Sequence, residues 1–164
     1  MLIFIITLLS LLPNVLMQAS VMPEIVVSPN VCIGKNATDE NYVFGGVAAI
    51  DEDADGNIYV LDFKFRTIKK YNGEGVFIKN IGKIGQGPGE IPQFTVDMAI
   101  SDNKIYLLLL NMVIVYSLEG DYVDTIRLLF FPRFIGVDLE GNMYLISDNG
   151  PNGKMINMLD KDGR

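Results

Sequence analysis

The sequence "VAAIDEDADGNIYVLDFKFRTIKKYNGEGVFIKNIG", residues 47–82, decides the fold class. Short runs of β-branched, aromatic and other apolar residues alternate with polar ones, and Asp-Gly and Glu-Gly pairs separate the runs. An alternation of period two between glycine-containing turns is typical of antiparallel strands joined by tight hairpins. The segment therefore predicts a meander of four short strands.

The same pattern recurs in residues 97–126, "DMAISDNKIYLLLLNMVIVYSLEGDYVDTI", and in residues 134–164, "FIGVDLEGNMYLISDNGPNGKMINMLDKDGR". The equivalent positions are Tyr59, Tyr106 and Tyr144, then Tyr71, Tyr116 and Leu159, then Gly75, Gly120 and Gly163. Four short strands in a unit of about 40–45 residues are typical of a propeller blade. The sequence thus predicts an all-β fold, a partial β-propeller of about three four-stranded antiparallel blades.

The stretch "DEDADGNIYVLD", residues 51–62, spaces its acidic residues and its glycine as an EF-hand calcium loop does. An EF-hand needs a helix on each side, whereas both flanks predict strands, and the equivalent turns of the other units lack the three carboxylates. We therefore expect Asp55 and Gly56 to form a tight hairpin turn in which the aspartates are solvated. Weak calcium binding by Asp51, Asp53 and Asp55 is the alternative, and no other cofactor is predicted.

Residues 1–19 contain no charged side chain and one short apolar run, which predicts an apolar signal helix that is cleaved on export. An uncleaved signal is the alternative, and it is the one route to the membrane that the sequence suggests. Residues 20–46 then form an N-terminal segment, in which "PEIVVSP" is a candidate ring-closing strand, and residues 47–164 form the blades. We expect an extracytoplasmic protein, either periplasmic or secreted.

The composition excludes several classes of function. The net charge is −7 at pH 7, and this acidity argues against nucleic-acid partners, which need a basic surface. The chain has no histidine, which excludes Ser-His-Asp and Cys-His catalysis and every zinc site that contains histidine. Its single cysteine excludes a disulfide within the chain. No catalytic residue is predicted, and a binding module is favoured over an enzyme.

Residues 55–91 resemble the NHL-type six-bladed β-propellers of bacterial secreted proteins. In this stretch Gly-Asn-Ile-Tyr-Val is followed by Asp62, Arg66 and the glycine-rich "GQGPGE". The resemblance extends over about residues 24–164 and fades in the second unit. It implies a ring of six blades, of which this chain would be an N-terminal fragment. The remaining blades, or a second copy of the chain, would then be needed to close the ring. We also expect Asp62 and Arg66 to form an ion pair within one hairpin.

In a four-stranded meander, alternate connections lie on opposite faces of the ring. The first and third turns of each unit share one face, and the longer connections share the other, where binding residues usually lie. The candidate ligand-binding residues on that second face are Lys64, Arg66, Lys83, Gln86, Glu90 and Arg133.

The sequence therefore predicts a non-enzymatic extracytoplasmic binding or scaffold propeller that presents long loops to a protein, peptide or glycan partner. The alternative, which the resemblance implies, is a propeller-type lyase or hydrolase. Its central metal would be held largely by ligands in blades that these 164 residues do not contain.

Overall fold

The computed structural model describes residues 30–34, 38–150 and 153–164. The expected signal helix and the candidate ring-closing strand lie outside the described residues. Within the described part of the chain, no helix combines the length and the apolar character needed to cross a bilayer. The elements are η1 (Glu40–Tyr42), β1 (Val47–Glu52), β2 (Ile58–Asp62), β3 (Thr67–Tyr71), β4 (Phe77–Ile81), β5 (Lys83–Ile84), β6 (Glu90–Ile91), β7 (Thr95–Ser101), β8 (Lys104–Leu109), β9 (Met112–Ser117), β10 (Tyr122–Arg127), β11 (Pro132–Val137), β12 (Met143–Gly150) and β13 (Gly153–Leu159).

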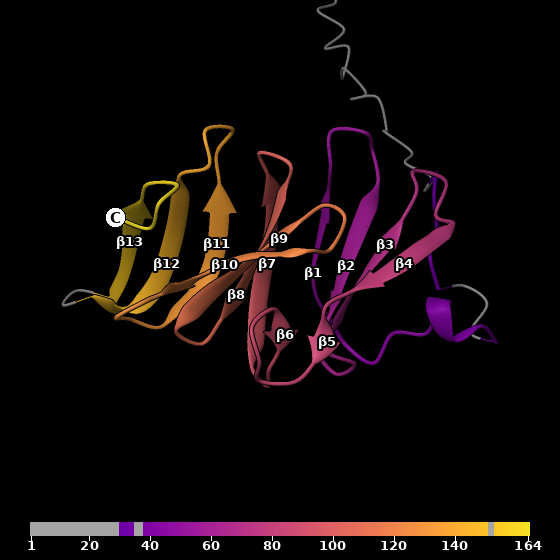
Figure 1. The fold of residues 1–164 in the computed structure, drawn as a ribbon, viewed down its shortest axis with the longest axis horizontal. Coiled ribbons are helices and arrows are strands. Elements are labelled where there is room, and N and C mark those ends of the chain that lie inside the picture. The colour runs from indigo at the N-terminus through magenta and orange to yellow at the C-terminus, as the bar shows by residue number, and fades with distance from the viewer. Residues whose placement is uncertain (1–29, 35–37, 151–152) are drawn as a thin grey trace, which may run out of the picture.

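Among the described residues, eleven strands form three antiparallel sheets that lie side by side in chain order, and β5 and β6 form a separate pair (Figure 1). Blade 1 has the order β1-β2-β3-β4, blade 2 has the order β7-β8-β9-β10, and blade 3 contains β11-β12-β13. This arrangement confirms the predicted all-β class, although blade 3 has three strands among the described residues where four were expected. The strand pairing confirms the repeat, because Tyr59, Tyr106 and Tyr144 take the same place in the second strand of each blade, opposite Asp51, Ala99 and Gly136.

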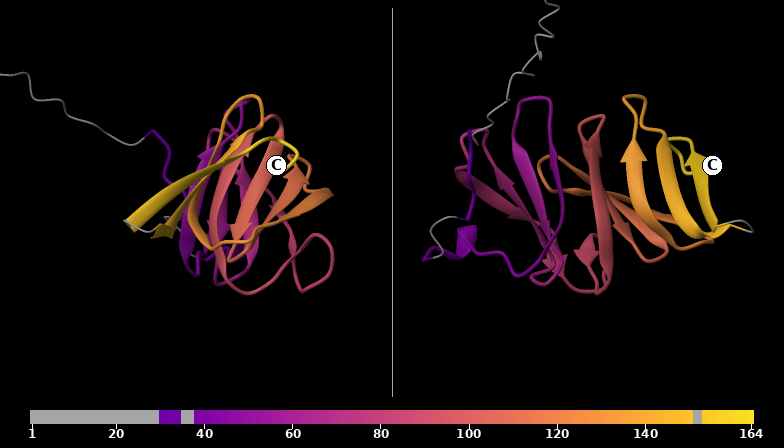
Figure 2. Two further views of the ribbon diagram at one scale, coloured as in Figure 1. Left: turned by 90° about the vertical axis from the view of Figure 1, so that its left-hand side faces the viewer. Right: turned by 180° about the vertical axis from the view of Figure 1, so that it is seen from behind.

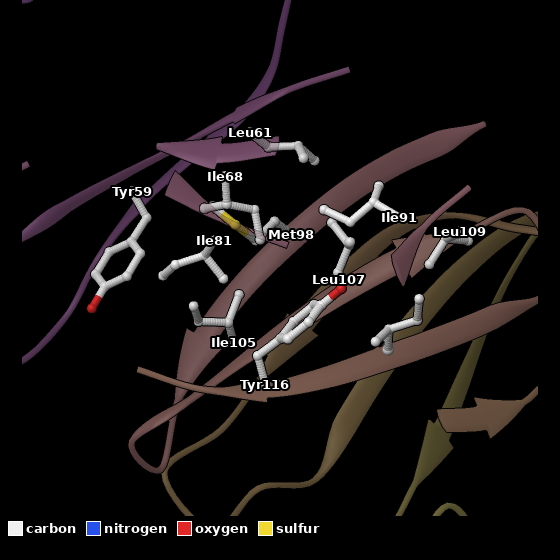
Figure 3. Packing of buried hydrophobic residues seen from close by; sticks show 11 residues of the cluster. Tyr59, Leu61, Ile68, Ile81, Ile91, Met98, Ile105, Leu107, Leu109 and Tyr116 are labelled. Carbon is white, nitrogen blue, oxygen red and sulfur yellow. The ribbon is translucent and has the colours of Figure 1, made fainter. Parts of the chain in front are cut away.

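The core consists of two apolar layers, one on each side of blade 2. On β8, Ile105, Leu107 and Leu109 pack toward blade 1, while Tyr106 and Leu108 pack toward blade 3. A strand that is buried on both faces needs a continuous apolar run, which explains the leucines in this part of the sequence. Figure 3 shows the first layer, in which side chains from blade 1 and blade 2 meet.

The N-terminal segment is attached to β3 of blade 1 through its backbone carbonyls. The Lys69 ammonium donates to the carbonyls of Glu40, Asn41 and Val43 at 2.8, 3.3 and 2.8 Å. The hydroxyl of Tyr71 donates to the same Asn41 carbonyl at 2.6 Å. Lys69 and Tyr71 are both buried, so these bonds fix the segment against the blade where water is largely excluded.

The connections between strands divide the molecule into two faces. The β1–β2, β7–β8 and β11–β12 turns lie along the upper edge in Figure 1, and we call this side the short-turn face. The β2–β3 connection and residues 82–94 lie along the lower edge, on what we call the long-connection face. Residues 82–94 contain β5 and β6, a short parallel pair that the sequence did not predict (Figure 2). The predicted separation of short and long connections is confirmed for these segments.

Candidate ligand-binding face

The first turn of blade 1 is built around a buried carboxylate. Asp53 accepts hydrogen bonds from the backbone N–H groups of Asp55 and Asn57 at 3.0 and 2.9 Å. It also accepts from the Asn57 amide and the Tyr59 hydroxyl, each at 2.9 Å. Asp53 is 7% exposed, so the expectation that it is a solvated turn residue is wrong. Asn57 and Tyr59 cover it because a buried carboxylate is stable only when its oxygens are hydrogen-bonded.

Blade 3 repeats this turn with less burial. Asp138 accepts from the backbone N–H groups of Glu140 and Asn142, from the Asn142 amide and from the Tyr144 hydroxyl. Burial raises the pKa of Asp53, but its hydrogen bonds outweigh this effect, and the pKa lies below its ordinary value. The side-chain hydrogen bond from Asn142 is the main reason that the pKa of Asp138 is also lowered. Both carboxylates are therefore charged structural centres of their turns.

The other two calcium candidates have different surroundings. One carboxylate oxygen of Asp51 accepts the backbone N–H of Ile100 at 2.7 Å, which links β1 to β7 of the next blade. Asp55 is exposed, and Gly56 has a φ of +78°, as a tight hairpin turn requires. The described part of the chain contains no group of three or more Asp, Glu, Cys or His side chains that could hold a metal ion. Asp51 and Asp53 thus stabilise blade packing and a turn, respectively.

A buried carboxylate also lies at the end of β2, next to the long-connection face. Asp62 is fully buried and accepts the backbone N–H groups of Gly45 and Gly46 at 2.6 and 3.1 Å. It also accepts those of residues 64 and 65, each at 3.1 Å. The expected ion pair with Arg66 is wrong, because the ion pairs formed by the described residues do not include it. Asp62 instead fixes the β2–β3 connection through backbone groups.

A cleft of about 570 Å³ opens between the β2–β3 connection and the chain that leads into β7. It is lined by Phe63, Lys64, Arg66, Gln93, Phe94 and Thr95. Lys64 and Arg66 are two of the six predicted residues, and the structure brings them together here. Phe63 and Phe94, which are 45% and 67% exposed, were not predicted as site residues from the sequence. Aromatic residues within long polar connections are the signal that would have identified them.

The cleft is cationic although the chain as a whole is acidic. Lys64 and Arg66 take part in none of the ion pairs formed among the described residues, and the lining contains no carboxylate. Lys69 lies near Arg66 in a neighbouring cleft of about 480 Å³, but three backbone carbonyls accept from its ammonium. Burial lowers the pKa of Lys69. Lys64 and Arg66 are therefore the cations whose charge is available to a ligand in this region.

The remaining predicted residues lie elsewhere on the molecule. Gln86 and Glu90 line a separate cleft of about 550 Å³ beside β9 and β10 of blade 2. Arg133 forms an ion pair with Asp148 of β12 in blade 3, and Lys83 is exposed on β5. The structure thus distributes the six candidates over several places and does not combine them in one site.

Comparison with solved structures gives similar propeller folds. A presumed exported protein from Bacteroides fragilis superposes with a TM-score of 0.64 and 20% identity, over 77% of this chain and 38% of that chain. Hydrazine synthase from Kuenenia stuttgartiensis has a TM-score of 0.54 and 17% identity, over 70% of this chain and 34% of that chain. Streptogramin B lyase superposes with a TM-score of 0.52 and 18% identity, over 71% of this chain and 41% of that chain. At these identities the similarity shows the fold alone, and this chain spans less than half of each structure.

No curated protein sequence matches the chain. A family model described as a 6-bladed beta-propeller matches residues 37–162, which include β1 to β13 and all the clefts described above. The repeated sheets, the equivalent tyrosines and the packing of blade against blade agree with that match. The chain belongs to the family of 6-bladed beta-propellers.

Proposed function

We propose that this propeller is a non-enzymatic extracytoplasmic module that binds a protein, peptide or glycan partner on its long-connection face. The observation that carries the proposal is the cleft lined by Phe63, Lys64, Arg66 and Phe94. Exposed aromatic rings lie there together with cations that form no ion pair among the described residues, whereas the buried Asp53 carboxylate of the short-turn face is bonded within its own turn and paired with Lys70. Side chains whose binding capacity is still free are those that can contact a partner.

The extracytoplasmic location is supported by the uncharged apolar residues 1–19 and by the similarity to the presumed exported protein. We expect the protein to be recovered from the cell envelope or the medium with an intact mass that lacks these residues. A full-length mass in the cytosolic fraction would contradict this location. Assignment to the NHL-type subgroup stays a prediction from residues 55–91.

The binding role can be tested on glycan and peptide arrays with the full chain and two matched variants. Phe94→Ala removes an exposed ring from the cleft, and Leu139→Ala removes a side chain that is 87% exposed on the short-turn face. We expect the wild-type protein and Leu139→Ala to bind the same partners and Phe94→Ala to bind at least tenfold more weakly. Equal binding by all three proteins would contradict the proposal that the partner binds on the long-connection face. A stoichiometric metal together with substrate turnover would favour the lyase or hydrolase alternative.

We further propose that additional blades of the same polypeptide complete the ring on the open side of blade 3. Phe134, Ile156 and Met158 are 53%, 69% and 63% exposed there. The pairing of these strands places Phe134 beside Ile146, and Ile146 beside Ile156, on one face of the sheet. A second copy of the chain is the alternative occupant. Analytical ultracentrifugation of the native protein separates the two, since a larger monomer supports added blades and a dimer of the 164-residue chain supports the second copy.

A further inference from the structure

Building on the proposed binding function, we infer that the cleft between the β2–β3 connection and residues 93–95 recognises a carboxylate joined to a flat apolar ring. The lining offers two kinds of contact in one space, the cations of Lys64 and Arg66 and the rings of Phe63 and Phe94. A volume of about 570 Å³ is within the range of small-molecule sites, and it would hold one ring-bearing group of a larger partner.

The charge of the ligand follows from the cations. Lys64 and Arg66 are without ion-pair partners among the described residues, and the nearby Asp62 carboxylate directs its oxygens to backbone N–H groups. An anion that enters the cleft would therefore meet two positive charges that are not engaged in ion pairs with the described residues. The planar fork of a guanidinium matches a carboxylate through two parallel hydrogen bonds. Because the chain carries a net charge of −7, a single negative charge is favoured over a polyanion, which the rest of the molecule would repel.

The ring follows from the exposed aromatic side chains. Phe94 is 67% exposed and Phe63 is 45% exposed, so both rings present apolar surface to water in the free protein. Covering such surface with another flat apolar group is favourable, and aromatic pairs gain further from offset or edge-to-face contact. The two rings come from different segments that line the same cleft, so a flat group bound there could contact both.

The backbone φ angles of the residues that line the cleft give a second, independent indication that it binds a ligand. Four residues other than glycine have positive φ among the described residues, and two of them, Asp102 and Asn103, form the β7–β8 hairpin turn, where such angles are ordinary. The other two are Arg66 at +51°, which closes the four-residue β2–β3 turn, where such an angle is also ordinary, and Phe94 at +75°, which lines the cleft. A bulky residue such as phenylalanine rarely adopts this conformation, and strained backbone is concentrated at ligand-binding sites. The strained backbone of Phe94 therefore lies at the cleft.

The test is an NMR titration of the full chain with 2-naphthoate, with its neutral isostere 2-naphthamide and with acetate. We expect 2-naphthoate to bind at least tenfold more tightly than either of the other two. Arg66→Gln and Lys64→Gln should each weaken 2-naphthoate binding about fivefold or more and leave 2-naphthamide binding unchanged. Lys83→Gln, which makes the same change of charge on exposed β5, should leave both unchanged.

Three outcomes would overturn the inference and still leave the binding function standing, and the first two concern the wild-type protein. In one, 2-naphthamide binds as tightly as 2-naphthoate, so that the cleft accepts a ring without needing its charge. In the other, no probe binds, although the partners found on the arrays still require Phe94. If the wild-type protein bound no partner on the arrays, that result would instead contradict the proposed function itself. An equal loss of 2-naphthoate affinity in Lys83→Gln would show that only the overall charge matters, which also overturns the inference.

Discussion

On the short-turn face, the oxygens of Asp53 accept hydrogen bonds from groups of the same turn, whereas on the long-connection face Lys64 and Arg66 have no ion-pair partner among the described residues. The acidic turn resembles a calcium loop in sequence, and in the structure its buried Asp53 carboxylate is hydrogen-bonded by Asp55, Asn57 and Tyr59. Lys64 and Arg66, two of the six candidate ligand-binding residues predicted from the sequence, line one cleft. The difference shows that charged side chains bonded within the protein hold the fold, whereas those without such partners keep their charge exposed at the surface, as the proposed function requires.

The largest expected effect tests whether a carboxylate near the long-connection face is also structural. Asp62→Asn replaces a fully buried carboxylate that accepts four backbone N–H groups. Because bonds to a charged acceptor are worth more than neutral ones, we expect a loss of about 3 kcal/mol in the free energy of unfolding, measured by urea denaturation. Asp148→Asn, at an exposed ion pair with Arg133, is the control and should cost less than about 1 kcal/mol. Equal losses would refute the structural role of Asp62.

The next largest effect is a difference in stability loss between the equivalent turns of blade 1 and blade 3. Asp53→Asn leaves the buried Tyr59 hydroxyl and the partly buried donors of Asn57 without a charged acceptor, and we expect a loss of about 2 kcal/mol in the free energy of unfolding. Asp138→Asn should cost clearly less, because the turn around it is more exposed and water can replace the lost bonds. Chemical denaturation of both variants checks the order. The reverse order would contradict burial as the cause.

The lowered pKa of Asp53 predicts how this difference depends on pH. A carboxyl whose pKa is lower in the folded protein than in the unfolded chain stabilises the fold above the unfolded value of about 3.9. That stabilisation is lost as the pH falls through the folded pKa. The gap in stability between the wild-type protein and Asp53→Asn should therefore be constant near neutral pH and shrink on acidification. Denaturation midpoints measured from pH 7 to pH 2.5 would show a constant gap if the account were wrong.

The smallest expected effect is that of the cleft cations on stability. Lys64→Gln and Arg66→Gln remove charges that make no ion pair within the described residues, so each should change the free energy of unfolding by less than about 0.5 kcal/mol. Thermal and urea denaturation check this result. A loss comparable to that of Asp53→Asn would mean that these side chains hold the fold and are not kept free for a ligand.

Much of the fold could be predicted because its signals are local. The period of two, the glycine turns and the recurring tyrosines predicted the strands and their grouping into blades, as the pairing of β1 to β13 confirms. The parallel pairing of β5 with β6 was not predictable, since strands of two residues leave no periodic pattern. The burial of Asp53 was missed for a related reason, because it depends on how Asn57 and Tyr59 fold back over the turn.

The candidate site was predictable only in part. The sequence placed Lys64 and Arg66 on the long-connection face, and the structure brings both into one cleft. It could not show that Phe94, which enters from the chain before β7, lies across from them, because that proximity depends on the packing of blade 2 against blade 1. The partner of Arg66 was wrongly predicted, since backbone N–H groups compete for Asp62 and the sequence does not display them.

Hydrogen–deuterium exchange of the full chain, with and without a partner identified on the arrays, tests most directly whether binding belongs to the long-connection face. The account predicts slower exchange of residues 63–66 and 93–95 in the presence of the partner, with residues 51–57 unchanged. Slower exchange at residues 51–57, with none at the two segments of the cleft, would contradict it.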